Sequence, residues 1–221
     1  MNIQFIKKTL LSLLPILLNN MQTFNEKYIS ESLRCIQSFK AFEGTDELKY
    51  EDAITKVAIM IQALEKSKKH LYFAGNGGSA GITSHLALDF WKNANVKAQA
   101  FNDSSLLSAV GNDIGFEYVF SKPIEMFAET NDMIIAISSS GNSQNIINAA
   151  IAGKQKGCYV VTLSGFSDDN KLKILGDMNF HVSSFSYGLV EVFHTLIIHQ
   201  LLDYKMHELD GVDIFNKNTK K

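Results

Sequence analysis

The 221-residue sequence has little of what marks several common protein classes. Its two cysteines, Cys35 and Cys158, lie far apart without metal-type spacing, so we expect buried reduced thiols of the kind found in cytoplasmic proteins. Lys and Arg number 21 against 23 Asp and Glu, which provides no basic field for nucleic acid or for an anionic membrane. The sequence also lacks internal repeats, low-complexity linkers and any sign of a second domain.

The first twenty residues contain a pair of lysines and a short apolar run, which resemble the charged and apolar regions of a signal peptide. The run is too short to span a bilayer, Pro15 interrupts it, and no small-residue cleavage pattern follows. We therefore treat residues 1–20 as an N-terminal extension and residues 21–221 as a single domain. Two interpretations of the extension stay open: an amphipathic segment that packs on a partner subunit, or an upstream start codon with Met21 as the natural beginning.

Helical periodicity dominates the next part of the chain. Apolar residues recur at three- and four-residue spacing over residues 24–42 and 47–68, which predicts two amphipathic helices. Between them, residues 44–46 (Gly-Thr-Asp) provide a stop signal followed by a capping residue. We therefore expect an N-terminal helical hairpin.

Beyond the hairpin the sequence alternates between strand and helix patterns. Strands are predicted at 70–74, 96–101, 132–138, 158–163 and 178–182. Helices are predicted at 79–91, 104–110, 143–156, 169–175 and 187–208. The strands are continuously apolar, which indicates an α/β fold with a doubly wound, five-stranded parallel sheet flanked by helices on both faces. Ligands of such sheets bind beyond the carboxyl ends of the strands.

Two loops of small residues fall at such strand ends. Residues 75–79 (Gly-Asn-Gly-Gly-Ser) and 138–143 (Ser-Ser-Ser-Gly-Asn-Ser) each lead from a strand into a helix, where backbone N–H groups and hydroxyls favour an anion such as phosphate. The first loop lacks the spaced glycines of a dinucleotide fingerprint, and neither loop has the lysine of a P-loop. Ser143 also stands at the N-cap of the following helix. The loops predict an enzyme that acts on a phosphorylated small molecule.

Titratable residues stand on the helix that follows the first loop and on the last predicted helix. His85 and Asp89 are four residues apart and share a helix face. Glu191, His194 and His199 lie in an otherwise apolar helix, where burial is costly unless they are paired, hydrogen-bonded or bound to a metal. Positions 191 and 199 differ by about 80° around the helix axis, and positions 194 and 199 by about 140°. Glu191 and His199 could therefore serve one site, with His194 facing elsewhere.

Taken together, these motifs carry a family resemblance. The two loops, His85, the Gly-Asn-Asp-Ile-Gly-Phe segment at 111–116 and the histidine-containing last helix resemble the sugar isomerase (SIS) domain of the bacterial phosphoheptose isomerase family, over residues 24–203. The resemblance implies a cytoplasmic enzyme that interconverts sedoheptulose 7-phosphate and a heptose 7-phosphate aldose. It further implies a homotetramer with active sites between subunits, and zinc in some members.

The resemblance also assigns roles to individual residues. Asp89 and His199 would be the catalytic pair, because aldose–ketose exchange needs a base for the proton next to the carbonyl and a second group for the oxygens. The zinc ligands would be His85, Asp89, Glu191 and His199. The sugar-phosphate contacts would be Asn76, Gly77, Gly78, Ser79, Asn112, Asp113, Ser138, Ser139, Ser140, Ser143 and Glu191.

The chain departs from the family pattern near the expected sugar contacts, which makes it a divergent member. Asp89 stands where the family usually has Glu, and a shift of the base by over 1 Å can cost on the order of a hundredfold in rate. Glu191 stands where Gln is usual, which adds a charge that favours a metal or a different substrate. Lys92, Asn93 and Gly188 also differ. Two alternatives therefore stay open: an isomerase of another sugar phosphate, or a non-catalytic SIS module that senses a sugar phosphate or scaffolds a protein assembly.

Overall fold

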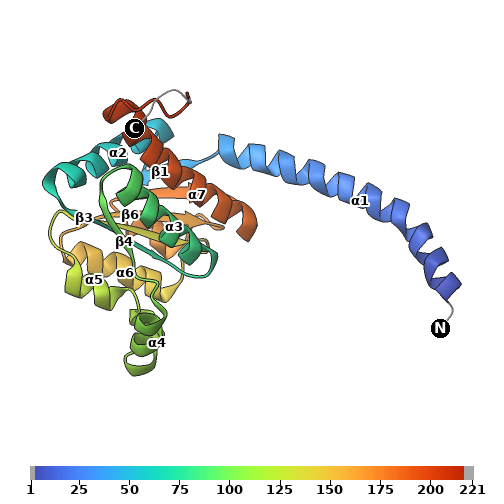
Figure 1. Cartoon of the computed structure of the whole chain (residues 1–221), viewed down its shortest axis with the longest axis horizontal. Helices are drawn as coiled ribbons and strands as arrows, with labels where there is room; N and C mark the ends of the chain where they lie inside the picture. The colour runs from blue at the N-terminus through green and yellow to red at the C-terminus, as the bar shows by residue number, and fades with distance from the viewer. Residues whose placement is uncertain (1–2, 217–221) are drawn as a thin grey trace. The chain divides into compact units, whose positions relative to one another are not determined.

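The computed structural model describes residues 3–216 and divides the chain into two units that meet between Ser38 and Phe39. The first unit is a helix, α1 (Ile3–Gln37), which contains Pro15 (Figure 1). The predicted boundary between residues 20 and 21 falls inside this helix. Residues 217–221, the end of the predicted domain, lie outside the described residues. No helix of the described chain combines the length and the apolar character needed to cross a membrane.

A mixed sheet forms the centre of the second unit, with strand order β2-β1-β7-β6-β5-β3-β4. Its strands are β1 (Lys40–Glu43), β2 (Asp46–Leu48), β3 (His70–Gly75), β4 (Lys97–Ala100), β5 (Met133–Ser138), β6 (Tyr159–Gly165) and β7 (Met178–Val182). The last five strands pair in parallel, which confirms the predicted five-stranded parallel sheet. The first two strands extend it as an antiparallel hairpin against β7.

Helices cover both faces of this sheet. The α-helices of this unit are α2 (Tyr50–Ser67), α3 (Gly78–Asn93), α4 (Ser104–Asp113), α5 (Ser121–Phe127), α6 (Gln144–Gln155) and α7 (Tyr187–Tyr204). Short 3-10 helices lie at Phe116–Tyr118 and Lys171–Ile174, and a π-helical turn at Lys205–Leu209 follows α7. Helices α2, α3 and α7 lie on one face, and α5 and α6 lie on the other (Figure 1). All six residues of β5 are buried between the two layers, as expected for a central parallel strand.

The two predicted N-terminal helices form as α1 and α2, but the predicted direct turn between them is replaced by a pair of short strands. Helix α1 ends at Gln37, and the chain then forms the β1–β2 hairpin before α2 begins at Tyr50. Ala41 and Phe42 are buried on β1 while the backbone of this strand pairs with β7. Their spacing fits a helix equally well, but pairing satisfies the backbone N–H and C=O groups along the edge of β7. Local periodicity could not reveal that edge.

The sheet brings the two small-residue loops together. Strands β3 and β5 are neighbours, with Gly75 opposite Ile137, so the loops that follow them start side by side at the carboxyl edge. On the next strand, Ser164 of β6 lies opposite Ser138. Both cysteines are buried thiols, as predicted.

Candidate active site

A cavity of about 230 Å³ opens where β3 and β5 end. It is lined by Asn76, Gly77, Gly78, Ser79, Ile137, Ser138, Ser139, Ser140, Ser143, Tyr187 and Glu191. Every predicted sugar-phosphate contact except Asn112 and Asp113 is in this lining. Those two residues end α4, where both are exposed and the Asn112 amide donates to the Asp113 carboxylate at 2.7 Å. Tyr187 was missed, because an aromatic residue at a helix start carries no anion-binding signal of its own.

The serine loop presents hydroxyls rather than charge to this cavity. The Ser138 hydroxyl donates to Ser143 Oγ at 3.2 Å and lies 3.5 Å from Ser140 Oγ. Ser143 is the N-cap residue of α6, as predicted, but its side chain makes no capping hydrogen bond. Gly141 has φ +64°, and a Cβ there would overlap the buried Asn170 side chain, so glycine is required at this turn. The serine hydroxyls therefore gather at the positive end of α6, which suits an anion.

The glycine loop brings backbone close to a carboxylate on α7. Gly77 has φ +54° at the N-cap of α3, and a Cβ on Gly75 would come within 2.8 Å of the Ser79 carbonyl oxygen. A Cβ on Gly78 would overlap the carboxylate of Glu191. Glu191 therefore lies over the start of α3 and adds a negative charge to the lining of the cavity.

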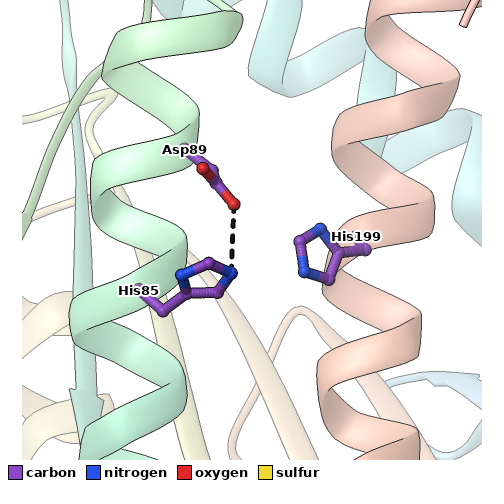
Figure 2. Close-up of side chains that lie close together, drawn as sticks. All are labelled: His85, Asp89 and His199. Atoms are coloured by element: carbon purple, nitrogen blue, oxygen red, sulfur yellow. Dashed lines mark ion pairs between the residues drawn. The ribbon is translucent and has the colours of Figure 1, made fainter.

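A second group of polar side chains lies between α3 and α7, farther along both helices (Figure 2). His85 Nε2 lies 3.2 Å from Asp89 Oδ2, so the i, i+4 pair on α3 forms as its spacing predicts. His199 faces them from α7, with its ring centroid 5.6 Å from that of His85. One ligand atom from each of the three residues lies within 4.8 Å of the other two.

This cluster has the donor set of a catalytic zinc site. Two imidazoles and one carboxylate match the three protein ligands that such sites use, with a fourth position left for water or substrate. The fourth predicted ligand, Glu191, is not in the cluster, because eight residues of helix separate it from His199 by about 12 Å along the axis. Of the predicted metal set, the described chain brings together His85, Asp89 and His199.

Asp203 adds a further carboxyl group beside the cluster. Burial raises the pKa of Asp203, the positive charge of His199 opposes this shift, and the negative charge of Asp89 reinforces it. The sequence contains a signal for this residue, because Asp203 follows His199 by four positions, just as Asp89 follows His85. Acidic side chains thus flank His199 from both helices.

His194 faces away from both groups, as its helical position predicts. Its side chain is fully buried, and Nε2 lies 3.0 Å from the carbonyl oxygen of Ser164 on β6. This contact requires the proton on Nε2, and Nδ1 then has no hydrogen-bond partner among the described residues. Burial lowers the pKa of His194 from 6.5 to about 4. The imidazole is therefore a neutral structural group.

Comparison with known proteins assigns this chain to a family. The SIS domain family matches residues 35–165, and the chain belongs to that family. It is 37% identical over 190 residues to a phosphoheptose isomerase of Helicobacter hepaticus, covering 83% of this chain and 92% of the relative. A phosphoheptose isomerase of Sulfurimonas denitrificans is 35% identical over 201 residues, covering 85% of this chain and 100% of the relative.

A solved structure agrees with these relatives. Phosphoheptose isomerase GmhA from Neisseria gonorrhoeae has a TM-score of 0.73 and 28% identity, covering 84% of this chain and 99% of that chain. Within the SIS proteins, the chain belongs to the phosphoheptose isomerase family and is an aldose–ketose isomerase. These relatives favour an enzyme over the alternative of a non-catalytic module.

Proposed function

We propose that this enzyme interconverts sedoheptulose 7-phosphate and the corresponding heptose 7-phosphate aldose. The proposal is supported by the fact that α3 and α7 both contribute to the cavity and to the His85–Asp89–His199 cluster. Gly78 and Glu191 line the phosphate-type cavity at the starts of α3 and α7, whereas Asp89 and His199 lie farther along the same helices. The spacing of about 12 Å along α7 suits an extended sugar phosphate with its phosphate in the cavity and its carbonyl end at the cluster.

Asp89 and His199 divide the proton transfers between them. The Asp89 carboxylate takes a proton from carbon 1 of the ketose and returns it to carbon 2, while His199 moves a proton from oxygen 1 to oxygen 2, through an enediol. His85, 3.2 Å from the Asp89 carboxylate, orients that base. The serine hydroxyls hold the phosphate, so that the reacting carbons stay fixed against Asp89.

Zinc fits the same cluster. Held by His85, Asp89 and His199, it would supply Lewis-acid polarisation of the sugar carbonyl. With a metal bound, His85, Asp89 and His199 would all act as ligands. Glu191 stays with the cavity in this arrangement, where it is placed to accept hydrogen bonds from sugar hydroxyls.

We further propose a cytoplasmic homotetramer with active sites at its subunit interfaces. Next to the cluster, α3 and α7 expose large apolar side chains that a partner subunit would cover: Leu88, Trp91, Val192 and Leu196. The two buried thiols suit a reducing compartment. Light scattering at several protein concentrations tests the assembly, and a monomer at all of them would refute it.

The test of function is conversion of sedoheptulose 7-phosphate by the purified protein, with zinc and with a chelator. We expect conversion by the wild type and a loss of at least a hundredfold in kcat for Asp89→Asn and His199→Gln. No conversion beyond buffer under either condition would refute the proposal. A panel of other sugar phosphates tests the alternative substrate that the Glu191 carboxylate in the cavity favours, because preference for another sugar would reassign the substrate and leave the reaction type intact.

A further inference from the structure

A pair of side-chain amides, of which Asn145 is buried and Asn76 is half-buried, connects the two loops of the cavity. The Asn76 side-chain amide donates to Asn145 Oδ1 at 2.8 Å, and the Asn145 amide donates back to Asn76 Oδ1 at 2.8 Å. Asn76 follows β3, whereas Asn145 lies 69 residues later in the first turn of α6 and is 4% exposed. The two hydrogen bonds therefore connect segments that are distant in the sequence.

The two asparagines stand in different relations to the cavity. Asn76 is part of its lining, but Asn145 is not. Each amide uses one donor and one acceptor on the other, so each keeps one donor and one acceptor lone pair for further contacts. Any effect of Asn145 on a ligand in the cavity must act through Asn76 or through the backbone at the start of α6.

The pair also links the two segments beyond the point where the sheet hydrogen bonds between β3 and β5 stop. The ladder between β3 and β5 stops at Gly75 opposite Ile137, immediately before the two loops. Beyond that point the Asn76–Asn145 pair spans the loops, while the Leu172 amide N–H holds the far side of the serine loop by donating to the Gly141 carbonyl at 2.9 Å. The serine loop is thus fixed on both sides before a ligand enters.

We propose that Asn145 is a positioning residue that holds Asn76 and the start of α6 at the separation an anion requires. This inference rests on the proposed phosphate-binding role of the cavity and does not depend on which sugar carries the phosphate. A preformed cavity lowers the ordering cost of binding, so loss of the pair weakens the affinity for the anion.

The first test compares Asn145→Ala with Asn148→Ala. Asn148 is one turn later on α6, and its amide donates to the Glu117 carbonyl at 2.8 Å, so the control loses a similar hydrogen bond outside the cavity. Isothermal titration with inorganic phosphate should show about tenfold weaker binding for Asn145→Ala, equivalent to about 1.4 kcal/mol, and a change within about twofold for Asn148→Ala. With a sugar-phosphate substrate, KM should rise more than kcat falls.

A second variant removes the hydrogen bond without leaving the empty space that alanine would create. Asn145→Asp keeps the shape of the side chain, and its protonated carboxyl can donate to Asn76 Oδ1 and accept from the Asn76 amide, whereas its carboxylate cannot donate. Its phosphate Kd, divided by that of the wild type at the same pH, should be well above 1 at pH 8, where the carboxylate prevails, and should fall as the pH is lowered toward the ordinary aspartate pKa of about 3.9. Glu191 also faces the cavity, but it is present in both proteins and cancels in this ratio.

The outcomes separate this proposal from the proposed function. Wild-type affinity for phosphate in folded Asn145→Ala, or a ratio near 1 for Asn145→Asp at pH 8, would overturn the positioning role. No binding of inorganic phosphate by the wild type would overturn it as well. Loss of phosphate affinity in Asn145→Ala, together with no turnover of sedoheptulose 7-phosphate by the wild type, would support the positioning role and refute the proposed substrate.

Discussion

Acidification should destabilise this protein through His194, and the size of the effect follows from its burial. Burial lowers the pKa of His194 to about 4 in the folded state, against 6.5 for an ordinary histidine. The folded protein therefore binds this proton more weakly than the unfolded chain does. The corresponding stability is fully present above pH 6.5 and is lost as the pH falls toward 4.

The difference of about 2.5 pKa units corresponds to about 3 kcal/mol when titration is complete. Between pH 7 and pH 5, where the unfolded histidine charges and the folded one stays neutral, the loss is about 2 kcal/mol. His181 is buried beside it, and burial lowers its pKa to about 4 too, although the Asp168 carboxylate opposes that shift. His181 therefore adds to the acid sensitivity of both the wild type and a His194 variant.

Urea unfolding at pH 7 and pH 5, at one protomer concentration, measures the effect. His194→Gln keeps an amide N–H for the Ser164 carbonyl and removes the titration, so the wild type should lose about 2 kcal/mol more than this variant between the two pH values. His207→Gln, at a side chain that is 35% exposed, is the control. Equal losses in the wild type and His194→Gln would refute the argument.

Three further predictions concern other parts of the chain. Asp89→Asn should keep the inorganic phosphate affinity of the wild type in titration calorimetry while turnover is lost, because the cluster and the cavity are separate. Lys205→Met should cost about 2–3 kcal/mol in urea unfolding, because it leaves the partly exposed carboxylates of Glu65 and Asp210 without their buried cation. Gly141→Ala should weaken phosphate binding and lower the melting temperature, because its φ of +64° and close packing exclude a Cβ.

Much of the fold could be predicted because its main elements carry local signals. The run that becomes β5 is continuously apolar and ends in a serine-rich turn, and both features are readable without tertiary context. The β1–β2 hairpin could not be predicted, because its strands have only four and three residues and their pairing partner is β7, far along the chain. Helix α5 was also missed. Pro123 indicates the end of a helix when the sequence is considered alone, although proline is tolerated in the first turn of a helix, where it stands in α5.

The site shows a different division between local and distant information. The spacing of His85 and Asp89 on one helix is enough to predict that they meet, and they do at 3.2 Å. Angular position on α7 also predicts that Glu191 and His199 share a side, but it says nothing of the rise of about 12 Å between them. Contacts with α3 separate the two residues. Glu191 packs against Gly78 at the cavity, where there is no side chain to exclude its carboxylate. His199 lies at the cluster with His85 and Asp89. One face of α7 therefore contributes to two sites, the cavity through Glu191 and the cluster through His199, because α3 runs beside it.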